Sequence, residues 1–336
     1  MKKIYLLLAI SLVNLGTYAQ QLPQYTQYVF NNYLINPAIT GIENYIDLKL
    51  GNRTQWTGLQ GAPVTSYVSI HAPIGKKFSG DNATSFEGHG NNPMSRSYVQ
   101  TYRAAEPHHG IGMHAVLDKA GPINRLNVNA TYAYHIGLSE KLNMSVGVSA
   151  GISRVSLDLN KITLENSSDP AISTIGNGST KPDLGAGIWL YGSRFFAGVS
   201  GQQLFGQTLS FTKDGEYKQG KAVRHFYLTA GYKFFLIDDI AAIPSIMVRN
   251  VSPVPNSYDA NLKLAFRDKF WLGGSYRYND SFSALAGFNV GSLLNLSYSY
   301  DFTTSELGNV SNGTHEVILG LLLNNRYKVT CPQRNW

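Results

Sequence analysis

The chain has 336 residues, a formal net charge of +7 and only 15% charged residues, against about a quarter in ordinary soluble domains. Lys and Arg are dispersed without a basic run, which argues against a nucleic-acid partner. The single cysteine, Cys331, excludes an intramolecular disulfide and a cysteine-based metal site.

Residues 1–19 have the pattern of a cleaved secretory signal peptide. A lysine-containing start leads into an apolar run, residues 4–15, that is too short to cross a bilayer as a helix. Thr17-Tyr18-Ala19 offers small residues at the positions that signal peptidase requires. The mature chain should therefore begin near Gln20, and a buried amino-terminal helix is the weaker alternative.

Aromatic residues are concentrated in residues 20–44, directly after the predicted signal. Tyr25, Val29 and Tyr33 recur at helical spacing, and Asn36-Pro37 would end a helix. Because disordered segments contain few aromatic residues, we expect a short amphipathic segment here rather than a disordered leader.

Residues 45–324 repeat one pattern, in which apolar and small polar residues alternate between Gly, Asn, Asp and Ser turns. Between Asn143 and Ser153, every even position is apolar and every odd position is Asn, Ser or Gly. Successive side chains of a strand point to opposite faces, so one face is apolar and the other is small and hydrated. A soluble sandwich would bury the apolar face, whereas a transmembrane barrel turns it toward lipid.

Residues 45–324 divide into fourteen predicted strands, and an even number places both chain ends on one side. The strands cover residues 45–53, 65–72, 110–118, 124–136, 141–157, 183–191, 194–201, 222–234, 240–250, 257–266, 269–277, 281–290, 293–301 and 315–324. We therefore expect an all-β, transmembrane outer-membrane barrel of about 14 antiparallel strands. Residues 20–44 would plug or brace its periplasmic mouth, and residues 325–336 would form a periplasmic tail.

The predicted connections fit this arrangement except at one place. Short turns at 192–193 and 291–292 fall on the periplasmic side, and longer loops at 158–182 and 202–221 fall outside. The segment 73–109 is long and polar, yet it would be periplasmic. We interpret it as a flexible insertion rather than a missed hairpin.

No catalytic or metal-binding arrangement stands out. His108 and His109 have no carboxylate at metal-ligand spacing and are expected in an exposed loop, and Gly176-Asn177-Gly178 lacks the Lys-Ser/Thr of a phosphate-binding loop. The predicted inward faces carry mostly Asn, Ser, Thr and Gly, with scattered charges at Lys233, Lys263, Arg277 and Asp301. We therefore predict no enzymatic activity and no cofactor.

The segment that joins the first two predicted strands contains more glycine, proline and potential binding residues than a simple turn requires. It contains Gly58, Gly61 and Pro63, which favour a tight loop. Arg53 and Trp56 are residue types that often carry binding energy. An equally good interpretation is an interfacial Trp and an interior Arg that shape the loop.

His315 and Glu316 begin the last predicted strand and face opposite sides, so they cannot form a simple metal pair. We favour a structural role, in which these residues fix the junction between the preceding loop and the last strand near the point where the barrel closes. The candidate structural or partner-binding residues of the whole chain are Tyr25, Tyr28, Asn36, Pro37, Arg53, Gln55, Trp56, Gly58, Gly61, Pro63, Tyr276, Arg277, His315 and Glu316.

Motifs spread over nearly the whole mature chain resemble one family in their order. They are Asn36-Pro37 with Gly41, the set Arg53, Gln55, Trp56, Gly58, Gly61, Pro63 and Thr65, Asp118 with Gly121, Gly231-Tyr232, Pro244-Ser245, Gly273 with Tyr276-Arg277, Tyr298-Ser299-Tyr300-Asp301 and His315-Glu316. The ordered set resembles the PorP/SprF family of outer-membrane proteins from the type IX secretion system of Bacteroidetes. The 73–109 insertion departs from the family pattern.

The resemblance implies a barrel that works in type IX secretion or gliding motility. Its partners would be secretion components, outer-membrane lipid and one secreted cargo protein, such as an adhesin, recognised through its carboxyl-terminal sorting domain. Two other functions stay open from the residues alone. One is a porin-like diffusion channel for small solutes, although charge lining is sparse, and the other is a soluble periplasmic β protein.

Overall fold

The computed structural model describes residues 24–75, 102–161, 178–205, 208–209, 220–221, 223–237, 239–251, 254–267, 269–291 and 293–325. Its strands are β1 (Ile46–Thr54), β2 (Val64–Ile74), β3 (His108–Ala120), β4 (Ile123–Ser139), β5 (Leu142–Leu157), β6 (Ser179–Tyr191), β7 (Phe195–Gln202), β8 (Thr208–Leu209), β9 (Gly220–Lys221), β10 (His225–Tyr232), β11 (Phe234–Ile237), β12 (Ile240–Val251), β13 (Val254–Phe266), β14 (Phe270–Arg277), β15 (Ser281–Val290), β16 (Leu294–Thr303) and β17 (Thr314–Leu323). The short 3-10 helices are η1 (Gln27–Val29), η2 (Asn32–Leu34), η3 (Pro37–Ile39), η4 (Leu159–Lys161) and η5 (Glu306–Asn309).

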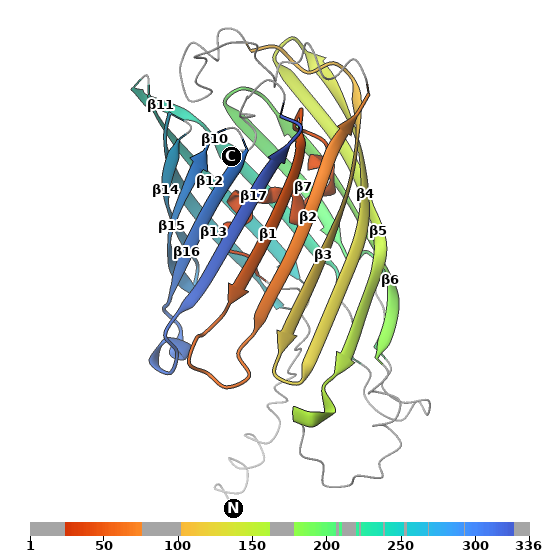
Figure 1. Ribbon diagram of the computed structural model, residues 1–336, viewed down its shortest axis with the longest axis vertical. Helices are drawn as coiled ribbons and strands as arrows, with labels where there is room; N and C mark the ends of the chain where they lie inside the picture. The colour runs from red at the N-terminus through yellow and green to blue at the C-terminus, as the bar shows by residue number, and fades with distance from the viewer. Residues whose placement is uncertain are drawn as a thin grey trace, which may run out of the picture.

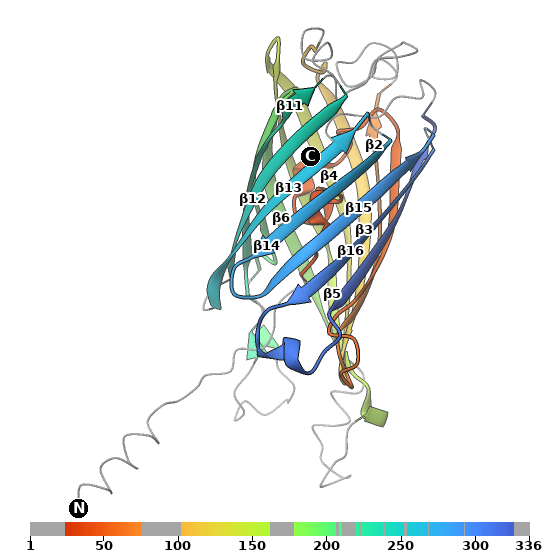
Figure 2. The same ribbon diagram turned by 90° about the vertical axis from the view of Figure 1, so that its left-hand side faces the viewer.

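All strands except β8 and β9 belong to one antiparallel sheet, which closes into a barrel in the described part of the chain (Figures 1 and 2). The pairing of β1 with β17 joins the first and last strands of the sheet, and β10 pairs with β12, so that each strand position of the wall has a neighbour on both sides. β10 and β11 share one wall position that is interrupted at Lys233, so the barrel has 14 strands. The predicted fold of about 14 antiparallel strands is confirmed, with residues 222–234 divided between β10 and β11.

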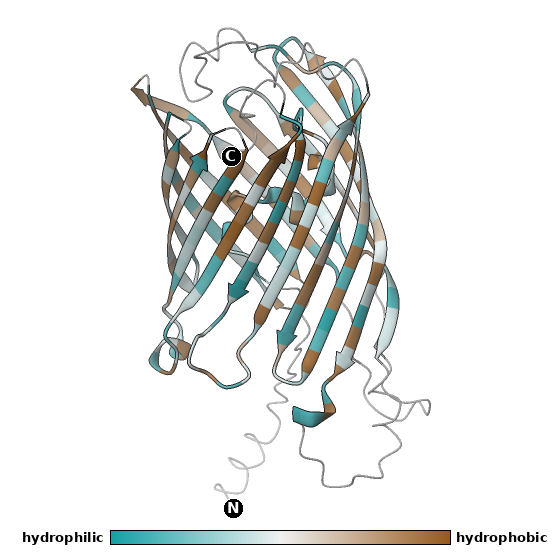
Figure 3. Cartoon of the chain, viewed as in Figure 1, coloured by the Kyte–Doolittle hydropathy of each residue, from teal (hydrophilic) through white to brown (hydrophobic). Residues whose placement is uncertain are grey.

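The two faces of the wall differ as the alternation predicts. On β5, Val146 is 47% exposed whereas its neighbour Ser145 is fully buried. Figure 3 shows hydrophobic and hydrophilic residues alternating along the strands. The apolar side chains therefore cover the outer surface, as in a barrel that meets lipid, and small polar side chains face the lumen. This arrangement replaces the soluble sandwich, in which the apolar side chains would be the buried ones.

The two ends of the barrel have different connections. At the end that we call the turn end, β4 joins β5 at residues 140–141, β1 begins and β17 ends. The opposite end, which we call the loop end, carries the 55–63 connection between β1 and β2 and the connection that contains η5. The short predicted turns thus share one end and the longer described connections share the other.

Strands extend into both ends of the predicted insertion at 73–109, because β2 continues to Ile74 and β3 begins at His108. The prediction that His108 lies in an exposed loop is wrong. His108 is buried in the lumen, where its ring stacks on that of His135 with 4.5 Å between ring centroids. Residues 76–101 lie outside the described residues.

The predicted signal peptide, residues 1–19, also lies outside the described residues, as does the predicted tail apart from Asn325. Among the described residues, no helix is long and apolar enough to cross a membrane.

Candidate functional site

The described residues 24–45 form a segment that lies inside the barrel, and we call this segment the plug (Figures 1 and 2). The expected short amphipathic segment with the helical spacing of Tyr25, Val29 and Tyr33 consists of three short 3-10 turns, η1, η2 and η3. Asn36-Pro37 does not end a helix, because Pro37 opens the turn η3 and Asn36 caps it.

The plug runs along the lumen from one end of the barrel to the other. Near the loop end, the Thr26 amide donates to Glu316, close to the start of β17. Near the turn end, the Thr40 carbonyl accepts from His135 and the Gly41 carbonyl accepts from His108. The plug therefore fills the lumen instead of only bracing the mouth where β1 begins, and its described amino-terminal end lies near the loop end.

A buried ionic network fastens the plug near the loop end. Arg53 of β1 donates to Asp301 of β16 over 2.8 Å and to Glu316 of β17 over 3.1 Å. The Thr26 hydroxyl joins the two strands to the plug, since it accepts from Arg53 and donates to Asp301. The Tyr67 hydroxyl of β2 donates to the other oxygen of Glu316. Charge-assisted bonds of this kind are stronger than those between neutral groups.

A second ionic group lies beside the first, on β13 and β14. Arg277 donates to both oxygens of Asp259, over 3.0 to 3.2 Å, and also to the Tyr25 carbonyl of the plug. The Tyr28 hydroxyl accepts from the Asn261 side chain. Burial raises the pKa of Tyr28 above its ordinary value, and the negative charge of Asp259 acts in the same direction. The structure thus brings Tyr25, Tyr28 and Arg277 together.

The middle of the plug rests on a wall of glycines. A Cβ added at Gly147 of β5 would lie 2.4 Å from the Pro37 carbonyl oxygen, and one at Gly187 of β6 would lie 2.1 Å from Asn36 Oδ1. The Asn36 amide also donates to the Ile188 carbonyl over 3.1 Å. Asn36-Pro37 therefore docks where only glycine leaves room for the Pro37 backbone and the Asn36 side chain.

Three histidines that the sequence did not identify as site residues hold the plug at the turn end. His71 of β2 accepts from the Gly41 amide, while His108 and His135 donate to the carbonyls of Gly41 and Thr40. His71 follows Tyr67 and Ser69 at the inward positions of β2, so the strand alternation could have identified it. Nothing in the sequence paired these rings with residues 40–41.

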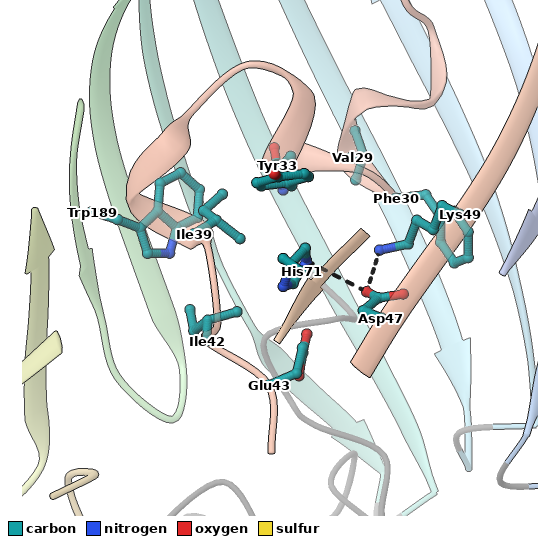
Figure 4. A pocket seen from close by; sticks show the side chains of 11 residues that line it. Val29, Phe30, Tyr33, Ile39, Ile42, Glu43, Asp47, Lys49, His71 and Trp189 are labelled. Atoms are coloured by element: carbon teal, nitrogen blue, oxygen red, sulfur yellow. Dashed lines mark hydrogen bonds and ion pairs between the residues drawn. The ribbon is translucent and has the colours of Figure 1, made fainter. Parts of the chain in front are cut away.

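Charged residues line a small cavity beside this histidine group (Figure 4). Asp47 contacts Lys49 at 2.6 Å and His71 at 3.8 Å, and Glu43 lies nearby. The cavity has a volume of about 20 Å³, which is room for about one water molecule. The described residues contain no group of three or more His, Cys, Asp or Glu placed to hold a metal ion.

Apolar packing joins the plug to walls on all sides of the lumen. One continuous cluster includes Phe30, Leu34 and Ile42 of the plug. It extends to Trp189 of β6 and Trp271 of β14, which belong to the two halves of the sheet. Burying large aromatic and aliphatic side chains is the main favourable contribution to packing.

The connection between β1 and β2 is tied to the connection between β16 and β17. The Thr57 amide donates to the Gly313 carbonyl over 2.9 Å, and the Asn312 amide donates to the Thr57 carbonyl over 2.7 Å. The connection is closed at its base, where the Gln55 amide donates to the Pro63 carbonyl. The two connections therefore form one loop-end joint.

Three residues of this connection have left-handed backbone angles. Gly58 and Gly61 have φ values of 95° and 77°, which glycine adopts without strain. Trp56 has a φ of 43°, although it is not glycine and its side chain is half-buried. Such a conformation costs about 1–2 kcal/mol in a residue with a side chain.

Two of the predicted site residues lie on the outer surface, away from the plug. Tyr276 is exposed there and packs against Phe282, with 4.6 Å between ring centroids. His315 points outward and shares a hydrogen bond of 2.7 Å with the Tyr298 hydroxyl. Tyr276 and Tyr298, both exposed, fit the aromatic belts that outer-membrane barrels place at the membrane interfaces.

Comparisons with known proteins found distant similarities to solved structures. The chain is similar to the toluene transporter TbuX of Ralstonia pickettii (11% identity, TM-score 0.46, 86% of this chain and 92% of that chain). It is also similar to the outer membrane protein Omp33 of Acinetobacter baumannii (8% identity, TM-score 0.46, 84% and 100%) and to the CymD monoaromatic hydrocarbon channel (11% identity, TM-score 0.45, 89% and 92%). Similarities this low say nothing about ligands or partners. No curated protein matches the sequence.

A family assignment comes from the sequence as a whole. The family described as type IX secretion system membrane protein PorP/SprF matches residues 17–321, which is most of the chain. The resemblance carried by the ordered motifs is therefore confirmed. The protein, an outer-membrane β-barrel, belongs to the PorP/SprF family of type IX secretion system membrane proteins.

Proposed function

We propose that the protein is a non-enzymatic partner in type IX secretion that assists the export or surface anchoring of one secreted protein, such as a gliding adhesin. In this proposal the barrel is a closed scaffold and its loop end is the recognition surface. The turn end faces the periplasm and meets components of the secretion system, in keeping with the short periplasmic turns of outer-membrane barrels.

The observation that carries the proposal is the attachment of the plug along its whole length. Thr26 is bonded into a buried ionic network near the loop end, Asn36 is docked on the glycine wall, and Thr40 is held by a histidine near the turn end. A lumen filled in this way favours a scaffold over the porin-like channel, which needs an open path.

The loop end has features of a surface that recognises another protein. The joint between the β1–β2 and β16–β17 connections is fixed by backbone hydrogen bonds, and rigid scaffolds that present loops commonly carry binding function. Leu307 and Val310 expose apolar side chains on this joint, with Val310 60% exposed. The backbone strain at Trp56 points the same way, because strained residues cluster at functional sites.

Affinity purification from native outer membranes tests the proposal. Tagged wild-type protein should co-purify with a large secreted protein that has a carboxyl-terminal sorting domain, or with secretion components, as identified by mass spectrometry. Substitution of both Leu307→Ser and Val310→Ser at the loop end should reduce this recovery at least ten-fold. Arg267→Gln, an exposed change at the turn end, is the matched control and should leave cargo recovery intact.

Conductance in planar bilayers separates the proposal from the channel alternative. Wild-type protein should show no large steady conductance, because the plug occupies the lumen. A solitary barrel that co-purifies with nothing and conducts steadily would contradict the secretion-partner function and favour a diffusion channel.

A further inference from the structure

A small pocket opens between the plug and the wall near the loop end. It is lined by Tyr25 and Tyr28 of the plug and by Tyr227, Arg249 and Asp259 of the strands β10, β12 and β13. Its volume is about 10 Å³, so it can hold about one water-sized group. The pocket lies where β12 ends and β10 begins, which is the side of the lumen that faces the loops.

Arg249 is a buried cation in this pocket without a counter-ion of its own. Its side chain is only 8% exposed, and among the described residues it makes no hydrogen bond or ion pair. Asp259 lines the same pocket, but both of its oxygens accept from Arg277. A buried charge that lacks a partner is costly, so this guanidinium is suited to an acceptor that enters from outside.

A second donor lies directly opposite Arg249. Tyr227 and Arg249 are register partners on the paired strands β10 and β12, so their side chains point to the same face. Tyr227 is 6% exposed, and within the described ranges its hydroxyl makes no hydrogen bond. The pocket thus presents a planar guanidinium and a phenolic hydroxyl side by side, which matches the two oxygens of a carboxylate.

We propose that Arg249 and Tyr227 form a binding site for a carboxylate group of a partner polypeptide that enters the lumen from the loop end. The pocket has room for one carboxylate oxygen between the two donors, while the other oxygen and the rest of the ligand remain in its mouth. Arg277 and Asp259 line the same pocket but are paired with each other, which leaves Arg249 as the cation available to an anion. Only the source of the carboxylate rests on the proposed secretion function.

Thermal unfolding of the purified full chain in detergent tests the site without any partner. Sodium acetate should replace sodium chloride at constant ionic strength, and the Tm of the wild-type protein should rise saturably, because a ligand that binds only the folded state stabilises it. Arg249→Gln and Tyr227→Phe should weaken the apparent affinity for acetate at least ten-fold. Arg267→Gln at the turn end is the matched control and should respond like the wild type.

Other ligands in the same unfolding experiment identify the source of the carboxylate. A short peptide with a free carboxyl terminus should stabilise the protein, and the same peptide as its amide should do so at least ten-fold more weakly. Equal responses of wild type and Arg249→Gln to acetate, or no saturable response, would overturn the site. A response to inorganic phosphate alone, or equal effects of acid and amide, would overturn the assignment to a polypeptide carboxylate. None of these arms needs cargo, so they fail separately from the secretion function.

Discussion

Arg53 on β1 and Asp301 on β16 form a 2.8 Å ion pair across β17, the strand that closes the barrel between them. The pair joins residues from opposite ends of the sequence, and the Thr26 hydroxyl of the plug lies between them. The same guanidinium that bridges the closing strands therefore also fastens the plug. One side chain therefore contributes both to the closure of the barrel and to the attachment of the plug near the loop end.

Replacement of Arg53 should destabilise the barrel strongly. Arg53→Gln leaves the buried carboxylates of Asp301 and Glu316 without their shared cation, and breaking a buried pair typically costs about 3–5 kcal/mol. The free energy of unfolding in urea, measured on protein refolded in detergent, checks this loss. The control Arg267→Gln removes an exposed pair with Asp239 and should change little, because surface pairs contribute little. Equal effects of the two substitutions would contradict the proposed role of the network.

Filling the glycine wall should loosen the plug. Gly147→Ala places a Cβ against the Pro37 carbonyl, and overpacking of this kind typically costs about 1–3 kcal/mol. Planar-bilayer recordings should then show conductance steps that the wild-type protein lacks. Gly274→Ala is the matched control, because its Cβ would be 4.0 Å from the nearest heavy atom on the exposed outer face. A silent Gly147→Ala barrel with unchanged stability would show that the plug does not depend on this contact.

The plug should become less stable in alkali. Burial raises the pKa of Tyr28 above its ordinary value, so the buried neutral phenol contributes stability that is complete below about pH 10 and is lost as the pH rises toward the folded-state pKa. The Tm measured between pH 8 and pH 11 should therefore fall at the upper end. Tyr28→Phe should make this fall shallower, whereas Tyr278→Phe, at an exposed position, should follow the wild type. Identical profiles for all three proteins would rule out this contribution of Tyr28.

Trp56 should matter for partner binding more than for folding. Trp56→Gly removes the side chain and relieves the left-handed backbone strain, so the free energy of unfolding should stay within about 1 kcal/mol of the wild type or rise. Co-purification of the secreted partner should fall at least ten-fold. Asn279→Gly is the control, since it relieves a similar φ of 57° in another connection and should keep the partner. If the Trp56→Gly protein still co-purifies with the partner, Trp56 serves as an aromatic residue at the membrane interface instead.

The alternation of apolar and polar residues correctly predicted which side chains of the barrel wall face outward and which face the lumen. The 143–153 segment assigned Val146 to the outer face and Ser145 to the lumen, and both lie there. Strand boundaries differed mainly where a strand continues past its alternating part, as β3 does to His108. The inward positions of Lys233, Lys263, Arg277 and Asp301 also follow from alternation, and all four side chains are buried.

The contacts between plug and wall could not be predicted from sequence. Tyr25, Val29 and Tyr33 have helical spacing, yet the segment folds into three separate 3-10 turns because its contacts with the wall outweigh local preference. Among the proposed site residues, Tyr25, Arg53 and Glu316 meet in the lumen, whereas Tyr276 and His315 face outward. Spacing along the chain carries no information about these long-range pairings.

The sequence by itself determined that this chain forms strands with one apolar and one polar face, because a period of two is a local property of each strand. That pattern predicted a barrel, and its closure between β1 and β17 is seen in the structure. The sequence also determined the family, through motifs whose order spans the chain. Only the tertiary structure decided that residues 24–45 fill the lumen, that Arg53 bridges Asp301 and Glu316, and that Arg249 lies buried opposite Tyr227. These relations depend on which strands become neighbours when the barrel closes, and that is a property of the whole sheet.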